Sequence, residues 1–194
     1  MALWGASDAD ESKPKNLTTA EKKEVFATAS GWVREAGSIL SGNGNVNADP
    51  EVLVAISGLA VSIGAADVTE VEWITTTADK SAGFTLSIRV RYNEAVTVTG
   101  NPTLAVTNGN QGSGSGRGPH TLVYASGSGT NELVFSLAIA AANAATNAND
   151  VLVVGAQNIA LAGGTLKDKG TSTNSAVAIS AGQGTACGSV TVVA

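Results

Sequence analysis

Apolar and polar residues alternate most regularly over residues 84–92. Every second position there is apolar: Phe84, Leu86, Ile88, Val90 and Tyr92. Side chains alternate across a β-strand, so this segment predicts a strand with one buried face and one face in water. Arg89 and Arg91 belong to the water-facing side of this pattern. The alternation returns over 133–139 and, more briefly, over 104–106, which predicts two further strands.

Shorter apolar runs continue to the C-terminus. They lie at 151–154, 159–161, 176–179 and 190–193. Between two of the longer runs, Gly127 and Gly129 supply the positive φ angles that a tight strand reversal needs. Short strands separated in this way predict an all-β fold, with a β-sandwich over residues 67–194. Residues 108–119 are rich in Gly and Ser and are expected to form an exposed loop between two strands.

The chain before residue 67 has a weaker pattern. Residues 1–20 are polar, and we interpret them as an extended arm, with a disordered terminus as the alternative. Thr18-Thr19-Ala20-Glu21 has the order of a helix start. The alternation that begins at Val25 instead favours a strand over residues 25–30, paired with residues 31–35.

A second strand-like run follows in the same part of the chain. Residues 51–56 form an apolar run, which predicts a buried strand. Small residues come next, and we place a domain boundary near Ala66. Because 66 residues support only a marginal core, residues 1–66 are expected to pack on the sandwich or on another chain. They are thus interpreted as an arm and a small β-rich docking region.

Composition argues against two classes of partner. The net charge is -5 and the 11 basic residues are scattered, whereas a nucleic-acid surface needs clustered Lys and Arg. No apolar run approaches the roughly 20 residues that span a bilayer, and the N-terminus lacks the features of a secretory signal. Cys187 is the only cysteine, so no intrachain disulfide forms, which suits assembly in a reducing cytoplasm. We expect neither nucleic acid nor a membrane as partner.

The reactive side chains are few and scattered. His120 is the only histidine, and no serine or cysteine is tied to it by sequence, so we interpret it as a surface histidine. Cys187 has no nearby histidine and is interpreted as a small buried or half-buried side chain. One cysteine and one histidine do not build a zinc site. These residues predict no catalytic group.

The carboxylates leave two alternatives to weigh. Oxygen ligands for calcium are available at Asp67, Asp150 and Asp168. No acidic pair has ligand spacing, which argues against a calcium site. A polysaccharide hydrolase would need two carboxylates facing one cleft. The candidates are Glu70, Glu72, Glu94 and Glu132, and the first two share one strand face without an evident partner. We expect no enzymatic activity, no cofactor and no metal.

Three stretches in the second part of the chain follow a familiar order. They are residues 92–104, 124–135 and 160–168. Their patterns, E-A-V-x-V-x-G-x-P-x-L, Y-x-S-G-S-G-T-x-x-L-x-F and L-x-G-G-T-x-x-D, resemble the immunoglobulin-like repeats of large bacterial adhesins. The resemblance covers residues 67–180 and implies an immunoglobulin-like β-sandwich. It also implies the alternative function of an adhesin-like binding module in a tail, a fibre or a cell surface. Such a module would recognise a host glycan or protein through the exposed loops 108–119 and 126–130.

The first part of the chain resembles a different group of proteins. Residues 1–5 (Met-Ala-Leu-Trp-Gly), and residues 24–33 leading to 51–59, are similar to structural proteins from tailed phages of marine cyanobacteria. This resemblance implies a non-enzymatic virion protein that assembles in the host cytoplasm. A capsid decoration or accessory head protein fits it best. The implied partners are the major capsid protein, other virion subunits and further copies of the chain.

Large apolar side chains in the first part are the candidate partner contacts. They are Trp4, Phe26 and Trp32. Aromatic side chains supply large contact areas at protein interfaces, and an extended arm adds backbone groups for pairing. We expect the N-terminal part to dock on the shell and the sandwich to project outward.

Overall fold

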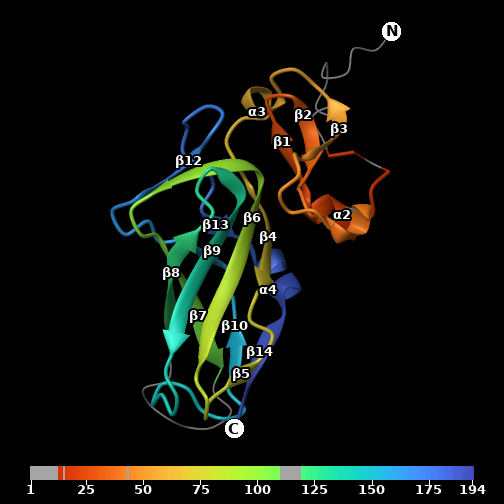
Figure 1. Cartoon of the computed structure of the whole chain (residues 1–194). Coiled ribbons are helices and arrows are strands. Elements are labelled where there is room, and N and C mark those ends of the chain that lie inside the picture. Colours follow the sequence, from red (N-terminus) through yellow and green to blue (C-terminus); the bar gives the residue numbers. More distant parts are fainter. Residues whose placement is uncertain (1–12, 15, 43, 110–118) are drawn as a thin grey trace.

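The computed structural model describes residues 13, 14, 16–42, 44–109 and 119–194; Trp4 and residues 110–118 of the predicted loop lie outside this part. Strands dominate the described chain (Figure 1). The strands are β1 (Val25–Thr28), β2 (Gly31–Arg34), β3 (Glu51–Ala55), β4 (Val68–Trp73), β5 (Ala78–Asp79), β6 (Phe84–Thr99), β7 (Thr103–Gly109), β8 (His120–Ser126), β9 (Thr130–Ile139), β10 (Val151–Val153), β11 (Gln157–Asn158), β12 (Thr165–Asp168), β13 (Ala178–Ile179) and β14 (Ser189–Val193). The short helices are α2 (Thr19–Lys23), the 3-10 turn η1 (Ile39–Ser41), α3 (Leu59–Ser62) and α4 (Ala181–Cys187).

Twelve strands of the described part form one mixed sheet. They follow the order β3-β2-β1-β6-β9-β8-β7-β10-β14-β5, and β12 and β4 also pair with β6. Most neighbours are antiparallel, whereas the pairs β1–β6 and β14–β5 are parallel. Strands β11 and β13 form a separate small sheet. The predicted fold class is confirmed at this level, since the protein is mostly β and is built around a large mixed sheet.

The long strand β6 lies at the centre of the sheet. It runs antiparallel to β9, β4 and β12. Its alternating apolar side chains are buried as predicted, and Leu86, Ile88 and Val90 are completely inaccessible. Burying one such side chain contributes about 1.5–3 kcal/mol. The same core holds side chains from the other long strands, among them Leu104, Leu122, Leu133, Phe135, Leu152 and Val192.

The described residues up to 66, called the N-terminal region from here on, form a small meander with a core of their own. Thr18 is the N-cap of α2 and forms a capping box with Glu21. The helix start that residues 18–21 predicted is therefore confirmed. The predicted hairpin is also confirmed, because β1 pairs with β2 in antiparallel register. A separate hydrophobic cluster lies between these strands and α3, and it contains Val25, Ala27, Trp32 and Leu59.

Three predictions are wrong, two for this region and one for the face of β6 that it covers. The predicted arm, residues 1–20, is not extended at its end, since Thr19 and Ala20 begin helix α2. The predicted burial of residues 51–56 fails as well: β3 is an edge strand whose neighbour among the described residues is β2, and Val52 is 54% exposed. Arg91, predicted to face water, is only 4% exposed. Its face of β6 is covered by the N-terminal region.

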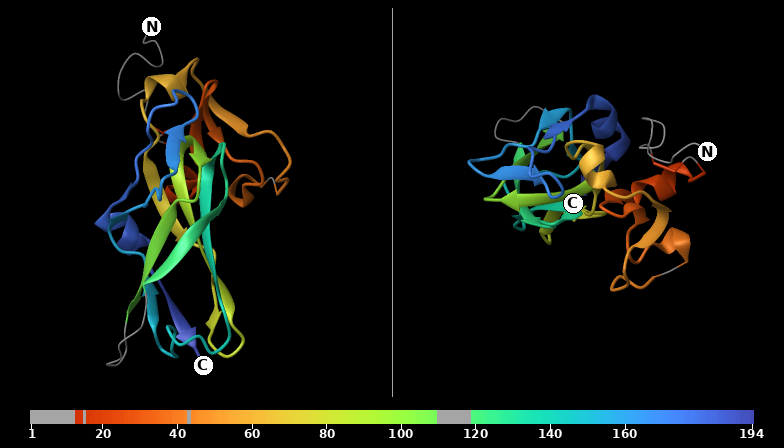
Figure 2. Two further views of the ribbon diagram at one scale, coloured as in Figure 1. Left: turned by 90° about the vertical axis from the view of Figure 1, so that its left-hand side faces the viewer. Right: turned by 90° about the horizontal axis from the view of Figure 1, so that it is seen from above.

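The remaining chain, residues 67–194, is called the C-terminal region. It is elongated, and the N-terminal region lies beside one of its ends, with the chain's C-terminus at the opposite end (Figures 1 and 2). Within the described residues, the two regions share one sheet through one parallel residue pair between β1 and β6, Ala27↔Glu94.

Candidate functional site

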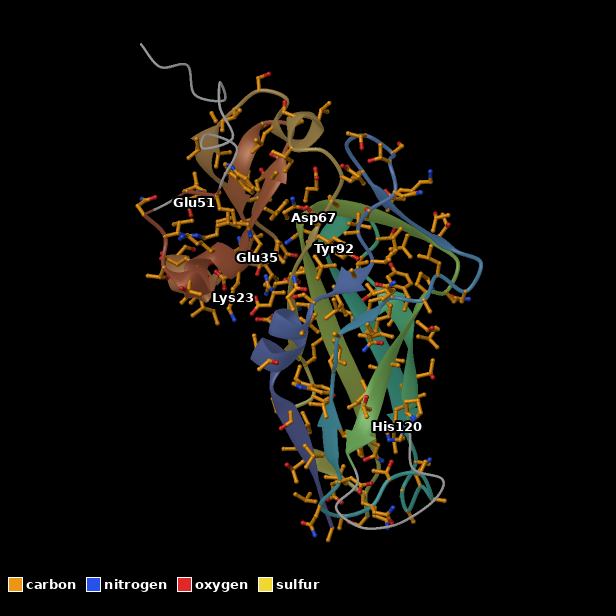
Figure 3. All side chains as sticks on the ribbon, turned by 180° about the vertical axis from the view of Figure 1, so that it is seen from behind. Lys23, Glu35, Glu51, Asp67, Tyr92 and His120 are labelled. Atoms are coloured by element: carbon orange, nitrogen blue, oxygen red, sulfur yellow. The ribbon has the colours of Figure 1, made fainter. Side chains whose placement is uncertain are left out.

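A buried arginine joins the two regions. The Arg91 guanidinium lies 2.9 Å from Glu35, 3.0 Å from Glu72 and 2.7 Å from Glu132. It also donates a hydrogen bond to the backbone carbonyl of Lys23, at 3.1 Å. Lys23 and Glu35 belong to the N-terminal region and lie on its side toward the C-terminal region (Figure 3). One cation therefore holds both regions through charge-assisted contacts.

The acidic residues weighed for hydrolysis are mostly bound in this network. Lys23 pairs with Glu70, and its Nζ lies 3.9 Å from Glu72. Arg89 lies 3.7 Å from Glu72 and 3.4 Å from Glu132. Glu70 and Glu72 share one strand face, as expected, but their partners come from other strands and from α2. These carboxylates serve the junction between the regions.

Crowding in this junction raises the pKa of Glu35 to about 7. Burial is the main cause; Arg91 acts in the opposite direction, and Glu132 adds to the rise. Lys13 faces the same network, and burial together with the charge of Arg91 lowers its pKa to about 8. The junction is therefore sensitive to protonation.

We expect the free energy of unfolding to fall as the pH rises from about 4.5 to about 7. The folded state holds the Glu35 proton more tightly than the unfolded chain, so this stabilisation is complete below the unfolded pKa and is lost as the pH passes the folded one. Urea unfolding at pH 4.5 and 7.5 measures the change. In Glu35→Gln this pH-dependent change in the free energy of unfolding should be smaller by about 1–3 kcal/mol. Glu51→Gln alters an exposed carboxyl and should leave the change as it is in the wild type. A Glu35→Gln protein with the wild-type pH dependence would contradict the raised pKa of Glu35.

A second acidic pair lies apart from the arginine. Glu94 on β6 and Asp168 at the end of β12 are each 1% exposed. Burial, followed by the negative charge of Asp168, raises the pKa of Glu94 to about 8. Asp67 adds a further negative charge. Sequence reasoning weighed Glu94 and Asp168 for different chemistries, and the fold brings them together.

The other candidate calcium ligand lies elsewhere. Asp150 is buried, accepts a hydrogen bond from the Asn147 amide at 2.7 Å, and acts electrostatically on His120. Within the described ranges, no group of three or more His, Cys, Asp or Glu side chains is placed to hold a metal ion. The set weighed from the sequence, Asp67, Asp150 and Asp168, is therefore not assembled as a unit.

His120 and Cys187 are both shielded. His120 is 6% exposed, with Nε2 3.2 Å from the Thr146 hydroxyl, and burial lowers its pKa. The prediction of a surface histidine is wrong, because His120 takes an inward position at the start of β8. Cys187 is half-buried as predicted. Burial raises the pKa of its thiol to about 11, which keeps it protonated and unreactive at neutral pH.

Four of the exposed large apolar side chains of the N-terminal region belong to one stretch of the chain. They lie on the connection from β2 to β3 and on β3 itself: Ile39 (85% exposed), Leu40 (50%), Val46 (71%) and Val52 (54%). The edge of β3 that faces away from β2 has no strand partner within the described chain. We call these four side chains and β3 the apolar edge. Sequence reasoning missed it, because it expected residues 51–56 to be buried.

The structure describes two of the three residues predicted to contact a partner. Trp32 is 3% exposed and packs in the cluster of the N-terminal region. Phe26 is half-buried and lines a cavity between the two regions. Trp4 lies outside the described residues. The structure thus gives Trp32 a place in this chain's own core.

The tip of the β8–β9 hairpin is held against the body of the protein. The Gly129 amide donates to the Val96 carbonyl at 2.8 Å, and the Val98 amide donates to the Ser128 hydroxyl at 2.9 Å. The Ser128 amide donates to the Tyr124 hydroxyl at 2.7 Å. This predicted recognition loop is therefore fixed by contacts within the chain.

Comparison with protein-family models, with curated proteins and with solved structures finds no match to this chain. None of the helices in the described part is long and apolar enough to cross a membrane. The assignment of function therefore depends on the geometry above and on the sequence patterns.

Proposed function

We propose that this protein is a non-enzymatic structural subunit of a virion. In this proposal the N-terminal region docks on the shell through the apolar edge, and the C-terminal region projects outward as a decoration or accessory head protein. The observation that carries the proposal is the apolar edge itself. Its four side chains are exposed, as is Val61 on α3, while most other large apolar residues of the N-terminal region are packed inside.

The apolar edge suits strand addition by a partner. An unpaired edge strand offers backbone donors and acceptors, and a partner strand satisfies them while side-chain pockets select the sequence. Exposed apolar side chains beside that strand add buried area on binding. The occupant that we propose is an edge strand of a capsid shell subunit.

The junction between the regions supports projection in a fixed direction. Arg91 contacts acidic groups of both regions, and β1 continues the sheet of β6. A subunit docked through β3 would therefore hold the C-terminal region rigidly. His120 lies toward the end away from Glu51, which marks the side that would face outward (Figure 3).

An immunoglobulin-like sandwich is part of the same proposal. The antiparallel strands β6, β9, β8 and β7 pack around a continuous core with β10 and β14. The Tyr92 hydroxyl donates to the Ala176 carbonyl at 3.1 Å and ties β6 to a distant loop. These features support a β-sandwich whose two layers are joined by hydrogen-bonded strands into one sheet.

The proposal of a non-enzymatic role is supported by the ion pairs of three of the four candidate carboxylates. Glu70, Glu72 and Glu132 form ion pairs at the junction. A glycosidase needs an acid and a base that face the same cleft. The virion assignment itself rests on the resemblance of residues 1–5 and 24–33 to phage structural proteins.

Binding to particles that lack this protein tests the proposal. We expect the double variant Ile39→Asp/Val52→Asp to bind such particles at least about tenfold more weakly, because charge at the interface must be desolvated. Val123→Asp, at a position that is 40% exposed on β8, is the matched control and should bind normally. Circular dichroism establishes that each variant is folded.

Two results would contradict the proposal. One is wild-type binding by the double variant. The other is binding of the wild-type chain to whole host cells and not to particles, which would favour the adhesin-like alternative.

A further inference from the structure

Glu94 occupies an unusual position at the junction of the two regions. It lies on β6, opposite Ala27 of β1, and is 1% exposed. No N–H or O–H group of the other described residues donates to either of its carboxylate oxygens, and its close polar contact is with the Asp168 carboxyl. A buried carboxylate without a compensating partner is costly, so such groups are neutralised by a proton, a cation or a metal ion.

The charges that act on Glu94 are negative. They belong to Asp168 and Asp67. Lys169 lines the same cavity with its Nζ directed to the Gly129 carbonyl at 3.2 Å, and its charge is not among those that act on Glu94. The electrostatics of this site therefore favour an added cation.

Asp168 presents a second set of oxygens to the same place. Its Oδ1 accepts from the amides of Gly170 at 2.5 Å and Thr171 at 3.2 Å, which fixes the carboxylate. Its Oδ2 is buried, and no N–H or O–H group of the other described residues donates to it. Together with Glu94, which lies against Asp168, this gives three buried carboxyl oxygens that accept no such hydrogen bond.

The space beside these carboxylates is kept open by a glycine. A Cβ on Gly170 would lie 3.1 Å from the Ala60 carbonyl oxygen and 3.2 Å from Asp168 Oδ1. Gly170 and Glu94 line a cavity of about 390 Å³ between the N-terminal and C-terminal regions. The cavity has room for water ligands, Ala60 also lines it, and the Ala60 carbonyl oxygen lies close to Gly170.

We propose that Glu94 and Asp168 bind a calcium ion at the junction between the two regions. The ligands on offer are all oxygens, in an irregular arrangement from separate segments, and calcium accepts such sets with carbonyls and water completing its shell. Magnesium demands a stricter octahedron, and zinc prefers nitrogen and sulfur ligands. A bound ion would link β6 with the loop after β12, next to α3.

Calcium titration of the isolated chain, after treatment with a chelator, tests this site. We expect binding by calorimetry and a Tm increase of about 5 °C or more with calcium at about 100 times its Kd. Glu94→Gln and Asp168→Asn should each weaken binding at least about tenfold, because each removes a charged ligand. Asp49→Asn is the control. It changes an exposed carboxyl that is distant in sequence from Glu94 and Asp168, and this variant should bind calcium as tightly as the wild type does.

Glu94→Gln keeps the shape of the side chain, and circular dichroism without calcium establishes that it folds. No calcium binding by the wild-type chain overturns the site, as does full binding by both Glu94→Gln and Asp168→Asn. Magnesium binding as tight as calcium binding also contradicts it. The titration needs no particle, so its result is independent of the proposed docking.

Discussion

Arg91→Met is expected to lower the free energy of unfolding by about 3–5 kcal/mol. The substitution keeps much of the side-chain volume but removes the charge that Glu35, Glu72 and Glu132 share. Glu72 and Glu132 would then repel each other in a partly buried junction, and the pKa of Glu35, which Arg91 lowers, would rise further. Removing one partner of a buried ion pair costs more than the pair contributes, because the remaining charge stays desolvated.

Arg89→Met is the matched control for this prediction. Arg89 is two residues away on the same face of β6 and contacts two of the same carboxylates, but its side chain is 33% exposed. Exposed pairs contribute little, so we expect a loss below about 1 kcal/mol. Urea unfolding gives both values. Equal losses in the two variants would show that Arg91 does not hold the regions together.

Gly127→Ala is expected to cost about 3 kcal/mol or more. Gly127 has φ +107°, which side chains rarely adopt, and an added Cβ would collide with the Glu132 carbonyl oxygen across the β8–β9 hairpin. The backbone of β9 would have to move to make room. Leu133 and Phe135 of β9 pack in the main core, so a shift of this strand would also displace buried side chains.

Gly129→Ala is the control that measures the cost of a positive φ without a steric collision. Gly129 also has a positive φ, +88°, but the nearest atom to an added Cβ is the flexible Lys169 Nζ at 3.7 Å. Only the conformational cost applies, so we expect a loss of about 1–2 kcal/mol. Thermal and urea unfolding measure both. A Gly129→Ala loss as large as that of Gly127→Ala would contradict the geometry of the hairpin.

Local patterns were sufficient to predict most of the strands. The alternation of residues 84–92 predicted both the strand and its core face, because period-2 patterning depends only on neighbours along the chain. The capping box at Thr18 and the hairpin of β1 and β2 were likewise local signals. The sequence did not predict that Arg91 is buried, since its cover comes from the distant N-terminal region.

The candidate site depended more on contacts between distant segments. Residues 51–56 are apolar enough for a central strand, but their place at the sheet edge is set by the order of strands. The pairing of Glu94 with Asp168 joins two strands that are far apart in sequence. Their adjacency follows from the register of β6 and β12, Val96↔Asp168, which no short motif encodes.

The location of the chain in purified phage particles tests the central claim most directly. Quantitative mass spectrometry of the particles, followed by imaging of their shells, gives its copy number and orientation. We expect many copies on the head, with β3 against the shell and the end of the C-terminal region nearest His120 pointing outward. Absence of the chain from every particle, or β3 facing solvent in the assembled head, would contradict the account.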